Sequence, residues 1–209
     1  MIGRLSLDEQ LAALKSVLSR NEVLVEVLNR TAGLGLPGWY LTAGCLFQSV
    51  WNVATDRHPT SGIKDYDVFC FDNHDLSWEA KDAVIKAADD AFAGLPAEVE
   101  ARNEARVHLW YEQKFGVACP PHACTEATID SFAATACRLG VRLEPDERWR
   151  VYTPHGLAAD VFNLVVRPNP VLAPREVYET KTARWRQQWP ELTVLDWPSE
   201  ATTLTPAST

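Results

Sequence analysis

The stretch from Trp39 to Asp72 constrains the fold of this chain more than any other part of the sequence. It begins with a short run of strand-forming residues that ends at Ala43 and Gly44. From Cys45 to Ala54, apolar residues then recur at the spacing of a helix. A second run of strand formers follows a polar loop. This order of strand, turn, helix and strand predicts a small mixed sheet flanked by helices, in an α/β (α+β) fold.

The turn at Gly44 is a candidate phosphate site. A glycine lets the backbone turn sharply and lets a ligand approach closely. The first amides of the following helix have no partner within the helix and point at any anion above the turn. Gly44 and Cys45, with Gln48 one turn further on, are therefore candidate nucleotide contacts, although Gly44 alone is also compatible with an ordinary turn.

The strand that follows the loop carries two carboxylates, Asp65 and Asp67. Side chains alternate between the two faces of a strand, so both carboxylates project to the same side. Such a pair is tolerated best when a divalent cation neutralises it, and oxygen ligands of this kind suit magnesium. An exposed polar strand face is the simpler alternative for these two residues taken alone.

Five segments together resemble one protein superfamily: AGCLFQSVWN, KDYDVFCFD, RNEARVHLWYEQKFG, TPHGLAADVFNLVVRPNP and the tryptophan-rich C-terminal region. The chain resembles the polymerase-β-type nucleotidyltransferases, and more narrowly a bacterial family of small, largely uncharacterised nucleotidyltransferase-like proteins. The resemblance implies a minimal nucleotidyltransferase fold with two N-terminal helices and a C-terminal extension. It also implies a third catalytic carboxylate on a later strand.

The segment AEVEAR is the first candidate for that later strand. Its alternation places Glu98, Glu100 and Arg102 on one face. The resemblance favours Glu100 as the third carboxylate, and Arg102 is a candidate phosphate contact because a guanidinium can grip two phosphate oxygens. Asp160 is the alternative third carboxylate, since its segment reads either as a strand or as a helical turn.

Capping and periodicity predict the remaining elements. Ser6, Asn21 and Ser77 are candidate helix caps. Helices are also expected over residues 103–116 and 125–136 and in the C-terminal segment from Arg175, where we expect the aromatic face to pack and the cations to stay in water. The other predictions are a hairpin around residues 145–146, one domain over residues 1–198 (N-terminal helices 1–36, catalytic core 37–116, C-terminal part 117–198) and a disordered tail over residues 199–209.

Composition limits the classes of function. The chain has 209 residues, of which 46% are apolar, and these values fit one folded domain. The net charge of −8 argues against an extended nucleic-acid surface. The sequence has no apolar run long enough to span a bilayer and no signal-peptide pattern. Its five cysteines are odd in number. A cytoplasmic protein without a membrane partner is therefore expected.

These observations predict a nucleotidyltransferase that moves a nucleoside monophosphate from an NTP to an unknown acceptor and releases pyrophosphate. Asp65, Asp67 and Glu100 would hold two Mg²⁺ ions, with Mn²⁺ able to replace them. The main alternative is a non-catalytic nucleotide sensor or protein-interaction module on the same fold. A sugar-nucleotide glycosyltransferase with an Asp-x-Asp motif is a weaker third hypothesis, because the chain is short for that fold.

Overall fold

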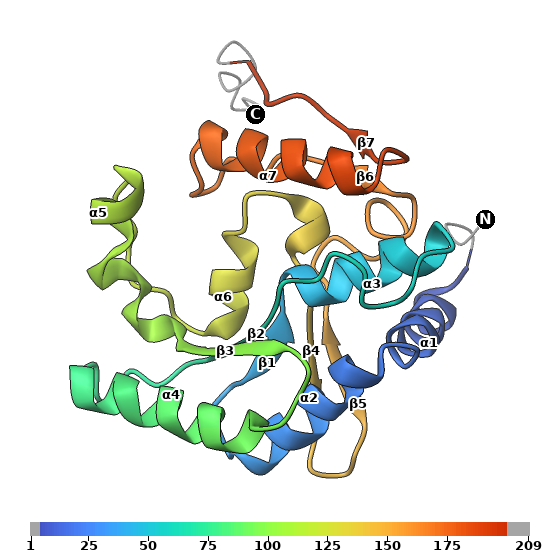
Figure 1. Cartoon of the computed structure of the whole chain (residues 1–209). Coiled ribbons are helices and arrows are strands. Elements are labelled where there is room, and N and C mark those ends of the chain that lie inside the picture. Colours follow the sequence, from blue (N-terminus) through green and yellow to red (C-terminus); the bar gives the residue numbers. More distant parts are fainter. Residues whose placement is uncertain (1–4, 200–209) are drawn as a thin grey trace.

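The structure is a computed structural model that describes residues 5–199. Two N-terminal helices precede the first strand, and the Trp39–Asp72 stretch forms the expected strand, helix and strand (Figure 1). The elements in chain order are α1 (Leu7–Leu18), α2 (Glu22–Gly33), β1 (Tyr40–Thr42), α3 (Gly44–Ala54), β2 (Asp65–Cys70), α4 (Trp78–Phe92), β3 (Glu98–Asn103), the 3₁₀ helix η2 (Glu104–Leu109), α5 (Tyr111–Phe115), α6 (Thr125–Asp130), the 3₁₀ helix η3 (Thr135–Cys137), β4 (Gly140–Leu143), β5 (Trp149–Tyr152), β6 (Val165–Val166), α7 (Arg175–Gln188) and β7 (Thr193–Val194).

The five-stranded sheet has the order β3-β2-β1-β4-β5. Strand β1 is antiparallel to both β2 and β4, and β4 is antiparallel to β5. Strands β2 and β3 are parallel, with α4 as the connection between them. This mixed sheet confirms the predicted fold class, and β4 and β5 confirm the predicted hairpin. A parallel pair formed by β6 and β7 lies outside this sheet.

The two faces of β2 have different partners. Tyr66 and Val68 are buried in the core, and the helices that contact β2 include α2 and α3. The hydroxyl of Tyr66 bonds to the side chain of Asn21, which also donates a 2.9 Å hydrogen bond to Ser49 of α3. In Figure 1, α6 and α7 lie on the opposite side of the sheet from α2 and α4. The Asp65 and Asp67 face of β2 therefore looks toward α6 and α7.

The predicted caps are present. Ser6 forms a capping box with Glu9, and the side chains of Asn21 and Ser77 accept hydrogen bonds from the first turns of α2 and α4. These side chains satisfy amides that would otherwise lack a partner at the start of each helix.

The C-terminal helix α7 docks on α3 through aromatic side chains. Trp185 contacts Phe47 and Trp51 at ring-centroid distances of 5.2 and 5.7 Å, and Trp189 contacts Trp51 at 5.5 Å. Trp185 and Trp189 are each only 2% exposed. The prediction that the aromatic face of this helix packs on the body is confirmed.

The prediction of one helix over residues 103–116 is wrong. The segment forms the 3₁₀ helix η2 and then the short helix α5, with Trp110 between them at φ −134°. Four consecutive residues of η2 are buried (Glu104, Ala105, Arg106 and Val107). This run of consecutive buried residues departs from the one-sided pattern of an amphipathic helix, on which the prediction rested.

The sequence also predicts a disordered C-terminal tail and no membrane-spanning segment. Residues 200–209, most of the tail that the sequence predicts to be disordered, lie outside the described residues. None of the helices within residues 5–199 combines the length and the hydropathy that a bilayer span requires.

Candidate active site

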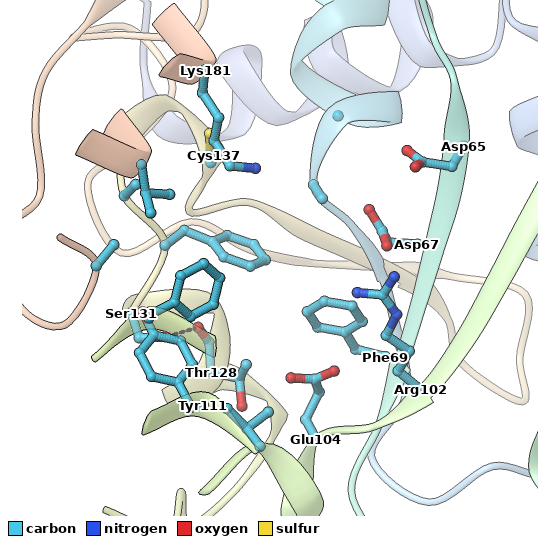
Figure 2. A pocket seen from close by; sticks show the side chains of 18 of the residues that line it. Asp65, Asp67, Phe69, Arg102, Glu104, Tyr111, Thr128, Ser131, Cys137 and Lys181 are labelled. Atoms are coloured by element: carbon cyan, nitrogen blue, oxygen red, sulfur yellow. Dashed lines mark hydrogen bonds between the residues drawn. The ribbon is translucent and has the colours of Figure 1, made fainter. Parts of the chain in front are cut away.

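A cavity of about 340 Å³ lies beside the Asp65 and Asp67 face of β2 (Figure 2). Its walls come from the start of α3, from β2 and η2, and from the helices α5, α6 and α7. One end of the cavity is rich in charged side chains and the other in aromatic ones. The charged side chains that line it are Lys64, Asp65, Asp67, Arg102, Glu104, Lys114, Lys181 and Arg184.

Asp65 and Asp67 point into this cavity from neighbouring positions on one face of β2 (Figure 2). Within residues 5–199, neither carboxylate accepts a hydrogen bond or forms an ion pair in the structure. Burial, and then the charge of Asp65, raise the pKa of the Asp67 carboxyl to about 6. The charges of Arg102 and Lys181 act on Asp67 in the opposite direction, but neither forms an ion pair with it within residues 5–199.

The start of α3 faces the same space. Thr42, at the end of β1, is the partner of Asp67 in the antiparallel pair, and the helix begins two residues later at Gly44. No side chain caps this helix, so its first amides keep their capacity to bind an anion. A Cβ atom added at Gly44 would lie 2.9 Å from the side-chain nitrogen of Gln48, so a glycine is required unless Gln48 moves.

The two other residues predicted on this turn contribute differently. Gln48 lines the cavity, and its buried side-chain oxygen has no hydrogen-bond partner among the described residues. The side chain of Cys45 is fully buried away from the cavity, where its thiol bonds to the carbonyl of Thr42 at 3.2 Å and burial raises its pKa well above the usual value. Cys45 can therefore contribute its backbone amide but not a reactive thiolate.

Besides Lys114, three cations that the sequence analysis did not select for the site line the cavity: Lys64, Lys181 and Arg184. None of the three forms an ion pair within the described part of the chain. Lys64 precedes Asp65 directly, whereas Lys181 and Arg184 come from α7. The docking of the α7 aromatic face on α3 brings these last two side chains to a site more than a hundred residues away in sequence.

Arg102 and Glu100 lie together on β3. Arg102 lines the cavity, and Figure 2 shows its guanidinium beside Asp67. Glu100 is the register partner of Asp67, but its carboxylate bonds to Arg102, and Glu100 does not line this cavity. No three His, Cys, Asp or Glu side chains within residues 5–199 converge closely enough to hold a metal ion. The structure thus brings Asp65, Asp67 and Arg102 to one cavity. Glu100 lies outside the lining of this cavity and is ion-paired with Arg102.

Asp160 lies elsewhere. It is in a turn between β5 and β6, is 3% exposed, and does not line the cavity. Its carboxylate accepts a 2.7 Å hydrogen bond from Arg167 and another from Thr135. These contacts describe a carboxylate that holds neighbouring loops together.

Glu104 is a site residue that the sequence analysis missed. It opens η2, is 5% exposed, and points into the cavity (Figure 2). Burial is the main cause that raises the pKa of the Glu104 carboxyl to about 8, while the nearby Arg102 acts in the opposite direction. The only sequence signal was a carboxylate four residues after Glu100, in a segment whose pattern predicted a different structure.

The geometry defines a class of protein: a mixed α/β domain in which a glycine turn opening a helix faces two carboxylates on the next strand. A family model described as "Nucleotidyltransferase" matches residues 29–194, and the chain belongs to this nucleotidyltransferase family. It is accordingly a nucleotidyltransferase.

A solved structure has the same fold. It is described as an NMR structure that reveals a CCA-adding enzyme head domain, and it aligns with a TM-score of 0.71 over 91% of this chain and 96% of that chain, at 24% sequence identity. At this identity the comparison supports the fold alone. No curated protein matches the chain.

Proposed function

We propose that this nucleotidyltransferase transfers a nucleoside monophosphate from an NTP to an acceptor hydroxyl or phosphate, with release of pyrophosphate. The observation that carries the proposal is the pair of carboxylates, Asp65 and Asp67, which form no ion pair within residues 5–199 and face the start of α3 across one cavity. The volume of about 340 Å³ falls within the range of small-molecule sites.

The carboxylates fit a divalent metal. Asp65 and Asp67 present oxygen ligands that form no ion pair with any cation of residues 5–199, and both burial and mutual repulsion disfavour the charged form of Asp67. Hard divalent cations such as Mg²⁺ prefer oxygen donors, and they would relieve this repulsion. When bound, such ions supply charge neutralisation at the entering and leaving oxygens of an in-line displacement.

The remaining charges suit a triphosphate. The amides of Gly44 and Cys45 would receive phosphate oxygens at the start of α3. Lys64, Lys181 and Arg184, which have no ion-pair partner within residues 5–199, would balance the charge of the phosphate chain. The side-chain oxygen of Gln48, which has no partner among the described residues, would orient a ribose or acceptor hydroxyl.

The acceptor would enter from a second cavity of about 550 Å³ between α4 and β3. This second cavity shares Arg102, Glu104 and Trp110 with the first and is also lined by Glu100. On this proposal, Glu100 would lie where an acceptor hydroxyl arrives. In this proposal Glu100 exchanges its contact with Arg102 for the acceptor and acts as the third carboxylate, and the freed Arg102 binds a phosphate oxygen.

The bond changes follow from these positions. The acceptor oxygen attacks the α-phosphorus of the NTP and loses its proton toward Glu100. The bond between the α-phosphorus and the oxygen that bridges to the β-phosphate breaks, and the electron pair leaves with pyrophosphate. Positioning and charge stabilisation, rather than covalent chemistry of the protein, account for the rate of such a transfer.

The acceptor class is the open part of the proposal. The likeness to a CCA-adding enzyme head domain makes the 3′ hydroxyl of a nucleic acid one acceptor to test. The net charge of −8 favours contact with a short end of such an acceptor, or with a small molecule, over an extended nucleic-acid surface.

The experiment is a screen of the four NTPs with Mg²⁺ or Mn²⁺ and a panel of acceptors, with release of pyrophosphate as the readout. Asp67→Asn is the inactive variant, and Asp82→Asn on the exposed surface of α4 is the matched control. We expect metal-dependent release that Asp67→Asn abolishes and Asp82→Asn retains. Nucleotide binding without turnover under every acceptor would instead support a nucleotide sensor on the same fold.

A further inference from the structure

The far end of the cavity holds two buried polar side chains that have no partner in the described part of the chain. The Glu104 carboxylate, 5% exposed, takes part in no hydrogen bond or ion pair within residues 5–199. The hydroxyl oxygen of Thr128 on α6 is buried and also has no partner among the described residues. Both residues line the cavity, and both lie in the lower part of the view in Figure 2. Buried polar groups without partners are rare in folded proteins unless a ligand supplies the partner.

The walls around these two groups are aromatic. Phe69 follows Asp67 on the same face of β2 and contacts Phe132 at a ring-centroid distance of 5.9 Å. Tyr111 of α5 closes the same end of the cavity. Flat apolar walls with a few convergent polar groups are typical of a pocket for a heteroaromatic ring. A triphosphate held near Asp65 and Asp67 would direct its nucleobase toward this end.

We propose that Glu104 and Thr128 read the base of the bound NTP, and that they select guanine. This inference rests on the proposed function, because it requires the triphosphate to bind at the start of α3. Among the four bases, guanine presents two adjacent donors, a ring N–H and an exocyclic amino group, beside one carbonyl acceptor. The donors match the two oxygens of a carboxylate, and the Thr128 hydroxyl can donate to the carbonyl.

Other bases satisfy the pair less well. Adenine, cytosine and uracil each leave one Glu104 oxygen without a donor, and a buried charge with an unmet hydrogen bond is costly. The ionised form of Glu104 is accessible, because the pKa of about 8 lies only about one unit above neutral pH, which corresponds to about a tenfold cost in affinity. Two hydrogen bonds to a charged carboxylate are strong enough to offset that cost.

The test is equilibrium binding of α,β-methylene analogues of GTP, ATP, CTP and UTP with Mg²⁺, measured by calorimetry. The proteins are the wild type, Glu104→Gln, Thr128→Val and the control Glu112→Gln, whose side chain is exposed on α5. We expect the wild type and the control to prefer the GTP analogue by about tenfold or more. Glu104→Gln should lose this preference, because an amide replaces one acceptor by a donor, while affinity for the other three analogues stays within a few-fold. Thr128→Val should weaken the GTP analogue selectively.

The outcomes separate the two proposals. Equal affinity of the wild type for all four analogues, or a preference that survives Glu104→Gln, overturns the base-reading role. A preference for another base overturns the assignment of guanine. Absence of binding of any analogue, with or without metal, contradicts the proposed function itself. Thermal melting of each variant verifies folding, and we expect Glu104→Gln to melt no lower than the wild type because it removes a buried ionisable group.

Discussion

The indole nitrogen of Trp189, which follows α7, donates a 2.9 Å hydrogen bond to the side-chain oxygen of Asn52 in α3. The Asn52 amide in turn donates to the carbonyls of Pro59 and Ser61, at 3.0 and 2.8 Å. Asn52 is fully buried and so links the C-terminal helix to the loop that leads into Lys64. The C-terminal region therefore stabilises one wall of the candidate active site as well as the fold.

This link predicts the effect of Trp189→Phe. The substitution keeps the aromatic contact with Trp51 but leaves the buried oxygen of Asn52 without a donor, at a cost of about 1–3 kcal/mol in the free energy of unfolding. Urea denaturation measures this cost, and hydrogen exchange should become faster in residues 55–64. The control is Trp197→Phe, because no hydrogen bond of the Trp197 indole occurs within residues 5–199. Equal stability of both variants would contradict the role of Asn52.

Backbone strain at the glycine turn gives a second prediction. Ala43 has φ 60° and ψ −140°, a conformation that glycine adopts far more readily than alanine. Such strain costs about 1–3 kcal/mol, so Ala43→Gly should raise the free energy of unfolding by part of that amount. Ala12→Gly, at an exposed position within α1, should lower it by about 1 kcal/mol. A destabilised Ala43→Gly variant would show that the turn is not strained.

The buried Glu104 carboxyl predicts a pH dependence of stability. Its pKa rises from 4.5 in the unfolded chain to about 8 in the folded protein. Between these values the folded state holds a proton that the unfolded state has lost, so the contribution of Glu104 to stability is present below pH 4.5 and is lost as the pH rises through about 8. Each unit of pKa shift corresponds to about 1.4 kcal/mol.

Urea denaturation at pH 5 and pH 8, in EDTA, tests this dependence. The wild type should lose more stability than Glu104→Gln between the two pH values, because glutamine does not titrate. The difference between the two proteins isolates Glu104 from the other titrating groups. Parallel stability curves for both proteins would contradict a raised pKa at this position.

Glu100 and Asp160 should respond differently to neutral isosteres. Glu100→Gln should lower transferase activity by about a hundredfold or more, on the scale of a lost general base or ligand, with little change in stability. Asp160→Asn removes the partner of Arg167 and Thr135 and should cost about 1–3 kcal/mol of stability while the folded fraction keeps its activity. Activity assays combined with melting temperatures separate the two effects. An active Glu100→Gln variant together with a folded but inactive Asp160→Asn variant would show that Asp160, and not Glu100, is the third carboxylate.

Local patterns in the sequence were enough to predict several of the strands and helices. The alternation around Asp65 and Asp67 correctly places both side chains on one strand face, and Ser6 and Ser77 cap helices as expected. These features depend on neighbours within a few residues, so a single sequence contains the information. The functional roles of Asp65, Asp67, Glu100 and Gly44 remain predictions.

Features that depend on tertiary contacts were not predictable in the same way. Lys181 reaches the cavity because Trp185 packs on Phe47 and Trp51, a contact that joins distant parts of the chain. Glu104 was missed because a charged residue is expected in water, whereas this one opens a 3₁₀ helix whose first four residues are buried.

The most direct test of the account is a crystal of the protein soaked with Mn²⁺ and the α,β-methylene analogue of GTP, with anomalous scattering used to locate the metal. We predict manganese within coordination distance of Asp65 and Asp67, and phosphate oxygens against the amides of Gly44 and Cys45. Well-ordered nucleotide elsewhere on the protein, or manganese bound away from both aspartates, would contradict the assignment of this cavity as the active site.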